Sequence, residues 1–151
     1  MRIRIEFDEN LIEDEVIIRC KKLDDTIQKI QQSISDITFL EQKLCFWKGE
    51  KEYYLPIESI LFYETSGNKV NAHTIDDIYE IKYRLYELEE MLPRQFMRIS
   101  KSAILNIDKV FSIERSLTAS SVIQFYKSHK QVYVSRLYYK ELRNRLEERR
   151  N

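Results

Sequence analysis

Short segments of alternating apolar and polar residues, separated by turn residues, dominate this chain from about residue 43 onward. Six of them are rich in β-branched and aromatic side chains: 60–64, 69–73, 78–81, 110–113, 122–125 and 131–134. Side chains of a strand alternate between two faces, so a period of two predicts strands with one buried face. Turn residues lie between them at strand-length intervals, for example at Gly49, Gly67 and Ser128. This spacing predicts antiparallel hairpins and a β core arranged as a meander.

Three other segments have helical spacing. Residues 24–37 repeat isoleucines at helical intervals behind two aspartates, which are favourable in a first turn. Residues 85–92 repeat leucine, and this helix must stop before Pro93 because proline disfavours helical geometry in the preceding residue. The last helix is predicted over 137–148. The fold class is therefore mainly β, and α+β overall.

The first forty residues are predicted to form a small strand-strand-helix unit, with strands at 3–7 and 16–20. A chain of 151 residues with 43% hydrophobic content can bury one good core, with room for a small appendage. Glycine and proline number only two each, so no flexible linker is expected and the unit should pack on the rest. We expect residues 1–40 to be a regulatory or dimerisation appendage and residues 41–151 to be the main domain.

Charge is segregated along the chain although the formal net charge is zero. Residues 1–40 carry a net charge of −3 and residues 41–93 a net charge of −5, whereas residues 94–151 hold 13 basic and 5 acidic side chains. A basic region of this size favours an anionic partner, because binding to phosphates releases counterions. The other interpretation is a solvated basic face.

Several classes of function find no support in the sequence. No run of about 18 apolar residues and no signal peptide is present, which predicts a cytoplasmic protein. Cys20 and Cys45 lie in strand-like segments typical of reduced, buried thiols, and His73 and His129 are isolated, so no zinc site or other cofactor is expected. Without a nucleophile-and-base pair or a Gly-rich phosphate loop, an enzyme is not expected. Single-strand binding by stacking on outward aromatic rings is a weaker alternative.

Three strings appear in a characteristic order: IESILFYETSGNKVNAHT at 57–74, FMRISKSAILNIDKV at 96–110 and QVYVSRLYYKELRNRL at 131–146. Together with the leucine helix between them, they make residues 43–147 resemble the LytTR family of bacterial DNA-binding domains. The resemblance implies an elongated fold of about ten short antiparallel strands in small stacked sheets. It also implies that double-stranded DNA is read by loops instead of a recognition helix.

By this resemblance the first DNA-contacting position is Asn68, followed by Lys69. An asparagine amide both donates and accepts, which suits the adenine edge in the major groove, while a lysine can bind a phosphate. A tight hairpin also selects glycine and asparagine for positive φ, so Gly67 and Asn68 have a purely structural alternative.

The second position is Lys101, with Arg98, Ser100 and Ser102 around it. Hydroxyls and cations at such a turn can bind phosphate oxygens. The family more often has a His-Arg pair where this chain has Ser100-Lys101. Lysine lacks the planar fork of arginine, so bidentate reading of guanine is not expected here. Asn106 is expected to be structural.

The third position is Arg136, directly after Ser135, which is placed to cap the last helix. A cation in the first turn of a helix opposes the macrodipole, so stability does not explain it, and Arg136 is the residue most expected to read a base. The later arginines of this helix are expected to give sequence-independent attraction or solubility; they are Arg143, Arg145, Arg149 and Arg150.

These observations predict a sequence-specific, response-regulator-like transcription factor that reads repeated promoter sites. Family members commonly carry a phosphorylated receiver domain, for which forty residues are too few. The resemblance implies two candidate partners for the N-terminal unit, an inhibitory membrane protein or a second copy in a homodimer, and no small-molecule substrate. The alternative is a protein-interaction module whose basic third binds an acidic protein.

Overall fold

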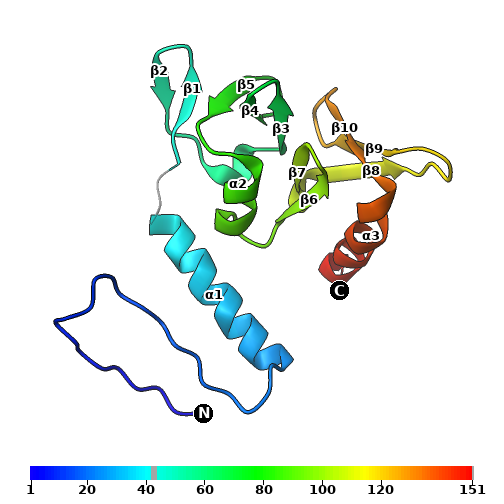
Figure 1. The fold of residues 1–151 in the computed structure, drawn as a ribbon. Helices are drawn as coiled ribbons and strands as arrows, with labels where there is room; N and C mark the ends of the chain where they lie inside the picture. The colour runs from blue at the N-terminus through cyan, green and yellow to red at the C-terminus, as the bar shows by residue number, and fades with distance from the viewer. Residues whose placement is uncertain (42–43, 151) are drawn as a thin grey trace.

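Two antiparallel sheets and three α-helices make up the computed structural model of this protein, which describes residues 1–41 and 44–150 (Figure 1). The seven-stranded sheet holds β1 Phe46–Lys48, β2 Lys51–Tyr53, β3 Phe62–Ser66, β4 Lys69–His73, β5 Ile78–Ile81, β6 Phe96–Ser100 and β7 Ala103–Asn106. The three-stranded sheet holds β8 Val110–Glu114, β9 Ser121–Phe125 and β10 Gln131–Val134. The mainly β fold class and the predicted strands of the main domain are confirmed.

Strand order departs from a simple meander in the larger sheet. Its order is β2-β1-β5-β4-β3-β7-β6, so the β1–β2 hairpin returns to the edge of β5 and the β6–β7 hairpin adds beside β3. The smaller sheet, with order β10-β9-β8, is a meander. The pairing of β3 with β7 joins residues about forty positions apart, as in Phe62 opposite Leu105. Local alternation contains no information about such a pairing.

The helices lie close to their predicted positions. They are α1 Asp25–Glu41, α2 Leu85–Met91 and α3 Arg136–Arg150, and two short 3-10 helices occupy η1 Ile57–Ser59 and η2 Ile107–Lys109. Helix α2 stops before Leu92, as the following proline predicts. Helix α3 begins one residue earlier than expected, so Arg136 is its first residue.

The core consists of two clusters that share the large sheet. The first packs under α2 and the second joins β3, β6 and β7 to the smaller sheet and α3. Fully buried members of the first include Phe46, Tyr63 and Leu88, and those of the second include Ile99, Ile123 and Leu142. Both clusters lie within residues 44–146, so the main domain holds the whole of the core described here.

The predicted N-terminal strands at 3–7 and 16–20 are wrong. Residues 1–24 contain a turn and bends but no strand, and run as an extended trace beside α1, apart from the sheets (Figure 1). Their apolar side chains are exposed, with Phe7 at 95% and Ile3 at 88%. An alternating segment becomes a strand only when another strand satisfies its backbone, and the described residues supply none.

Two further expectations about the N-terminal region change. No residue of 1–37 is buried, so the predicted packing of this unit on the sheets is not found. Cys20 is exposed and Cys45 is partly buried, and both thiols are free, so the expected burial is wrong for Cys20. Within the described part of the chain, no helix has the length and apolar character needed to cross a membrane.

Candidate nucleic-acid interface

Antiparallel register brings two hairpin turns to the same end of the large sheet. Strands β3 and β7 are paired up to Glu64 opposite Ala103, and the Thr65 N–H then donates to the Ser102 carbonyl at 2.9 Å. The β3–β4 turn begins after Ser66, directly beyond this bond. The turn containing Asn68 and the turn containing Lys101 are therefore neighbours.

The β3–β4 turn does not need asparagine for its backbone. Gly67 has a φ of +63°, in the left-handed region that favours glycine, but Asn68 is not among the described residues with positive φ. A requirement for positive φ therefore does not explain the asparagine at position 68. Its amide is exposed. The neighbouring Lys69 is also exposed and its Nζ lies 3.4 Å from Glu80 Oε2, so its charge is partly compensated.

Two serines define the shape of the β6–β7 turn. The Ser102 N–H donates to Ser100 Oγ at 3.1 Å, and the two hydroxyl oxygens are 3.3 Å apart. The register shifts between Arg98 and Ser100, which is typical of a β-bulge. Lys101 is exposed at the tip, and no ion pair to it occurs within the described residues. The turn therefore presents one uncompensated cation.

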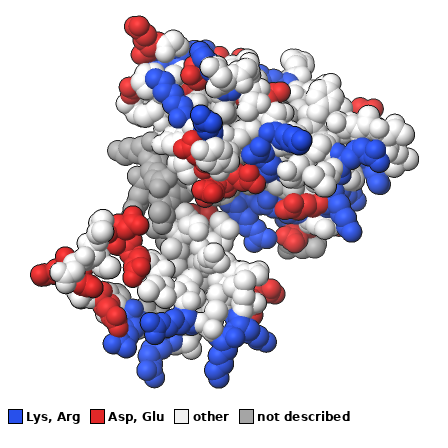
Figure 2. All heavy atoms as spheres, in the orientation of Figure 1, with Lys and Arg blue, Asp and Glu red and all other residues white. Residues whose placement is uncertain are grey.

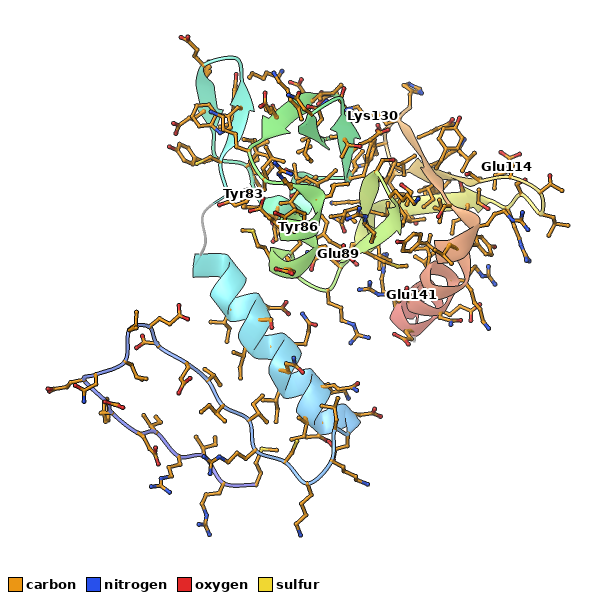
Figure 3. All side chains as sticks on the ribbon, viewed as in Figure 1. Tyr83, Tyr86, Glu89, Glu114, Lys130 and Glu141 are labelled. Atoms are coloured by element: carbon orange, nitrogen blue, oxygen red, sulfur yellow. The ribbon has the colours of Figure 1, made fainter. Side chains whose placement is uncertain are left out.

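The side chain of Arg98 donates hydrogen bonds to the backbone of this turn. Its Nε donates to the Ser100 carbonyl and its NH2 to the Lys101 carbonyl, both at 2.7 Å. Its NH1 lies 3.1 Å from Oε2 of Glu89, a residue of α2 labelled in Figure 3, and only 19% of the side chain is exposed. With these donors engaged, Arg98 is built to position the turn.

The start of α3 is fastened to the same region. The Ser135 N–H donates to the Ile99 carbonyl at 2.9 Å, directly before Ser100, and α3 packs against β6. Arg136 follows, exposed and without an ion pair among the described residues. Two backbone hydrogen bonds, from Thr65 and from Ser135, thus bring the turns of Asn68 and Lys101 and the helix start at Arg136 to one end of the main domain.

Sequence reasoning missed Arg115, which follows β8. Its guanidinium carbon lies 5.0 Å from the ring centroid of Tyr139, in the geometry of a cation–π contact. Tyr139 is three residues after Arg136 on α3, so the two share a helix face and Arg115 adds a second cation beside the first turn. A basic residue after a strand was its only sequence signal.

Three of the later arginines of α3, Arg143, Arg145 and Arg149, bind the protein itself, and the side chain of Arg150 lies outside the part of the chain that the structure describes. Arg145 NH2 donates to the Arg94 carbonyl, and burial lowers the pKa of its guanidinium. Arg149 NH1 donates to the Ile107 carbonyl and lies near Asp108, while Arg143 pairs with Glu147 at 3.0 Å. The expectation that they serve mainly for attraction or solubility is incomplete, because Arg145 and Arg149 also fasten α3 to the segments around β6 and β7.

Asn106 has the structural role predicted for it. It is 1% exposed, its Nδ2 donates to the Ile60 carbonyl at 2.9 Å, and its Oδ1 accepts from the Asp108 N–H at 3.1 Å. It therefore caps η2 from inside the protein. In the view of Figure 2, Lys and Arg lie around α3 and the smaller sheet, with acidic side chains interspersed, and a further group of Lys and Arg lies along the N-terminal segment.

The sequence profile of the LytTr DNA-binding domain matches residues 50–147. The chain belongs to this family. The structure also resembles the LytTr DNA-binding domain of a Bacillus cereus protein described as a methyl-accepting/DNA response regulator, with a TM-score of 0.62 and 20% identity over 68% of this chain and 95% of that one. The LytTR fold class predicted from the sequence is thereby confirmed. The family is a DNA-binding, non-enzymatic one.

Two curated relatives match over almost their full length. An HTH-type transcriptional regulator of Staphylococcus aureus strain NCTC 8325 is 29% identical over 147 residues, which cover 97% of this chain and 98% of the relative. Its counterpart in the bovine strain RF122 is 30% identical with the same coverage. The relatives are named for a helix-turn-helix, two helices joined by a short turn, but α1, α2 and α3 are each separated by five strands here.

Proposed function

We propose that this LytTR protein is a transcriptional regulator that recognises specific double-stranded DNA through loops. The observation that carries the proposal is the convergence of Asn68, Lys101 and Arg136, three exposed polar side chains presented by three connected loops at one end of the domain. Base readout requires a fixed arrangement of side chains, and the Thr65 and Ser135 hydrogen bonds support it by holding the three loops next to one another.

The side chains divide into readers and positioning groups. Arg136 can donate a bidentate pair of hydrogen bonds to guanine, and Asn68 can pair with an adenine edge. Lys69, Lys101, Ser100, Ser102 and Arg115 carry cations and hydroxyls suited to phosphate oxygens, which set orientation without reading sequence. For Arg98, its hydrogen bonds to the Ser100 and Lys101 carbonyls favour support of the Lys101 turn, and the DNA contact expected from the sequence stays a prediction.

The decisive experiment compares Arg136→Ala with Lys69→Ala. Arg136→Ala should relax preference at defined base pairs, at a cost of roughly 1 to 3 kcal/mol, because a base contact is lost. Lys69→Ala should weaken all duplexes alike, because only a phosphate contact is lost. Fluorescence anisotropy on matched and single-mismatch duplexes measures both effects, and the reverse pattern would contradict the assigned roles.

The duplexes for these measurements come from a sheared bacterial genome. Fragments are selected for binding to the protein at near-physiological salt. Enrichment of a shared repeated sequence by the wild-type chain, lost with Arg136→Ala, supports a regulator that binds specific promoter sites. Featureless recovery by both proteins would favour the alternative, an interaction module whose basic surface binds an acidic protein.

Regulation is proposed to enter through residues 1–40. Paired repeats in a promoter favour a homodimer, because linking two weak half-site contacts raises the overall affinity. A membrane protein that holds the regulator inactive is the competing partner for the same segment. Sedimentation of the full chain against a chain beginning at Glu41 separates these ideas, since both core clusters lie within 44–146 and the shorter chain should fold. The same number of copies per particle in both proteins would exclude the dimer role.

A further inference from the structure

The first eight residues present an unusual surface. Ile3, Ile5 and Phe7 are 88%, 77% and 95% exposed in a segment without regular secondary structure. In an extended chain, alternate residues share a face, so these three form an apolar row. The opposite row holds charges: Arg4 and Glu6 form an ion pair with a 2.8 Å separation, which confirms that residues two apart lie on one side.

A hydrogen-bonded turn at Asp8 ends this segment. The Leu11 N–H donates to the Asp8 carbonyl at 3.3 Å, and the Asn10 N–H donates to Asp8 Oδ1 at 2.9 Å, closing a turn. No strand partners the preceding backbone within the described residues. Residues 2–8 are therefore a bounded, unpaired strand candidate with one apolar and one charged face.

The order of charges along this segment is self-complementary. When two copies run antiparallel about a two-fold axis at Ile5, Arg4 faces Glu6 of the partner and Ile3 faces Phe7 of the partner. At the outer position Arg2 faces Asp8 of the partner, whose carboxylate can accept more than the turn's one hydrogen bond. Opposite charges and apolar pairs directly across an antiparallel ladder are both stabilising.

Other registers are disfavoured by the same charges. A shift of two residues in one direction places Arg4 opposite its own copy, and a shift in the other direction places Glu6 opposite its own copy. Shifts by one residue bring isoleucines opposite charged side chains, because side chains change face at every residue. Only the register centred on Ile5 places opposite charges or two apolar side chains across from each other at all four pairs of positions: 2 and 8, 3 and 7, 4 and 6, and 5 and 5.

We infer that this chain forms a homodimer by antiparallel pairing of residues 2–8 of two copies, with Ile5 on the two-fold axis. The contact is isologous, so every favourable pair away from the axis occurs twice, and the pair of Ile5 side chains occurs once on the axis. The apolar rows of both copies then form one continuous face, which can pack on the partly buried isoleucines of α1, Ile27 and Ile30. The inference rests on the proposed function, since it supplies the second copy that paired repeats require.

A charge swap in the full-length chain tests the register. Arg4→Glu alone and Glu6→Arg alone each place like charges opposite one another twice, and each should raise the dimer dissociation constant about tenfold. The double variant restores opposite charges and should return the constant to near its wild-type value. Sedimentation velocity over a concentration series, without DNA, provides the measurement. These positions lie outside the core, so folding of the main domain should be unaffected.

Disulfide trapping tests the axis. In a chain with Cys20→Ser and Cys45→Ser, Ile5→Cys should form a covalent dimer under mild oxidation, because Cα atoms across an antiparallel pair lie at roughly 4.5 to 5.5 Å, within disulfide reach. The matched control is Arg4→Cys, whose copies are offset by two residues in this register and should cross-link far more slowly.

Three outcomes would overturn the inference: a monomeric wild-type chain, single and double variants that weaken the dimer equally, or equal cross-linking at positions 4 and 5. Anisotropy on a duplex with one repeat separates this failure from failure of the proposed function. Sequence preference on one repeat with no dimer would overturn only the pairing. A charge-swappable dimer without preference would overturn only the DNA reading.

Discussion

At the scale of single residues, side chains of the same type have different hydrogen-bond partners at this site. Arg98 and Arg136 both belong to the sequence strings that indicated DNA binding. The structure gives the donors of Arg98 to two carbonyls and to Glu89, whereas Arg136 has no ion pair among the described residues. Charge alone could not separate them, because hydrogen-bond partners come from segments distant in sequence.

We expect Arg98→Ala to destabilise the protein by about 1 to 3 kcal/mol, since hydrogen bonds from a charged, largely buried group are lost. Affinity for all duplexes should fall together, because the Lys101 turn loosens. Arg94→Ala is the matched control: its pair with Glu148 is well exposed and should contribute no more than about 1 kcal/mol. Urea unfolding midpoints measure the difference, and equal midpoints would contradict the positioning role.

At the scale of elements, two hairpins with similar turns occupy different places. Gly67 in the β3–β4 turn and Gly49 in the β1–β2 turn have φ values of +63° and +59°, and both turns close two-residue loops. An alanine at either position finds open space but an unfavourable backbone. The β3–β4 turn carries Asn68 and belongs to the proposed interface, whereas the β1–β2 turn is not part of that interface.

Gly67→Ala and Gly49→Ala should each cost about 1 to 2 kcal/mol, the penalty for an L-residue in the left-handed region. Only Gly67→Ala should also weaken DNA binding, because it distorts the loop that presents Asn68. Thermal unfolding and anisotropy on the same proteins provide the comparison. Equal effects on binding would remove the β3–β4 turn from the interface.

The two sheets are joined near His73 of β4. Its ring stacks on Phe62 with centroids 4.2 Å apart, and its Nδ1 lies 3.4 Å from Lys130 Nζ, a residue of the β9–β10 loop labelled in Figure 3. On the other side its Nε2 lies 4.0 Å from Glu64 Oε2. Burial, and secondarily Lys130, lower the pKa of His73 to about 4.

The free energy of unfolding should therefore decrease as the pH is lowered from about 6.5 to about 4. The unfolded chain protonates this imidazole near its ordinary pKa of about 6.5, whereas the folded protein resists until about 4, so the unfolded state binds more protons between these values. The contribution is present above about 6.5 and is lost as the pH falls toward 4. His73→Phe keeps the stacking and should flatten this part of the urea-midpoint profile. His129→Gln, a substitution at an exposed histidine away from this contact, is the matched control.

At the scale of the whole molecule, the N-terminal segment and the main domain should be energetically separate. Both core clusters lie within 44–146, and no residue of 1–37 is buried. A chain beginning at Glu41 should keep the melting temperature of the full chain within a few degrees, measured by circular dichroism at low protein concentration. A large loss would show that the first forty residues stabilise the domain directly.

Sequence by itself determined the strands of the main domain, the end of α2 before Pro93 and the family, because alternation, proline and turn residues act over a few neighbouring positions. It also placed Asn68, Lys101 and Arg136 as candidates. It failed at residues 3–7, where alternation indicated a strand but no partner lies within the described chain. Only the tertiary structure decided that β3 pairs with β7 and that Ser135 binds Ile99. These contacts depend on hydrogen bonds between distant segments, and they bring the three loops together.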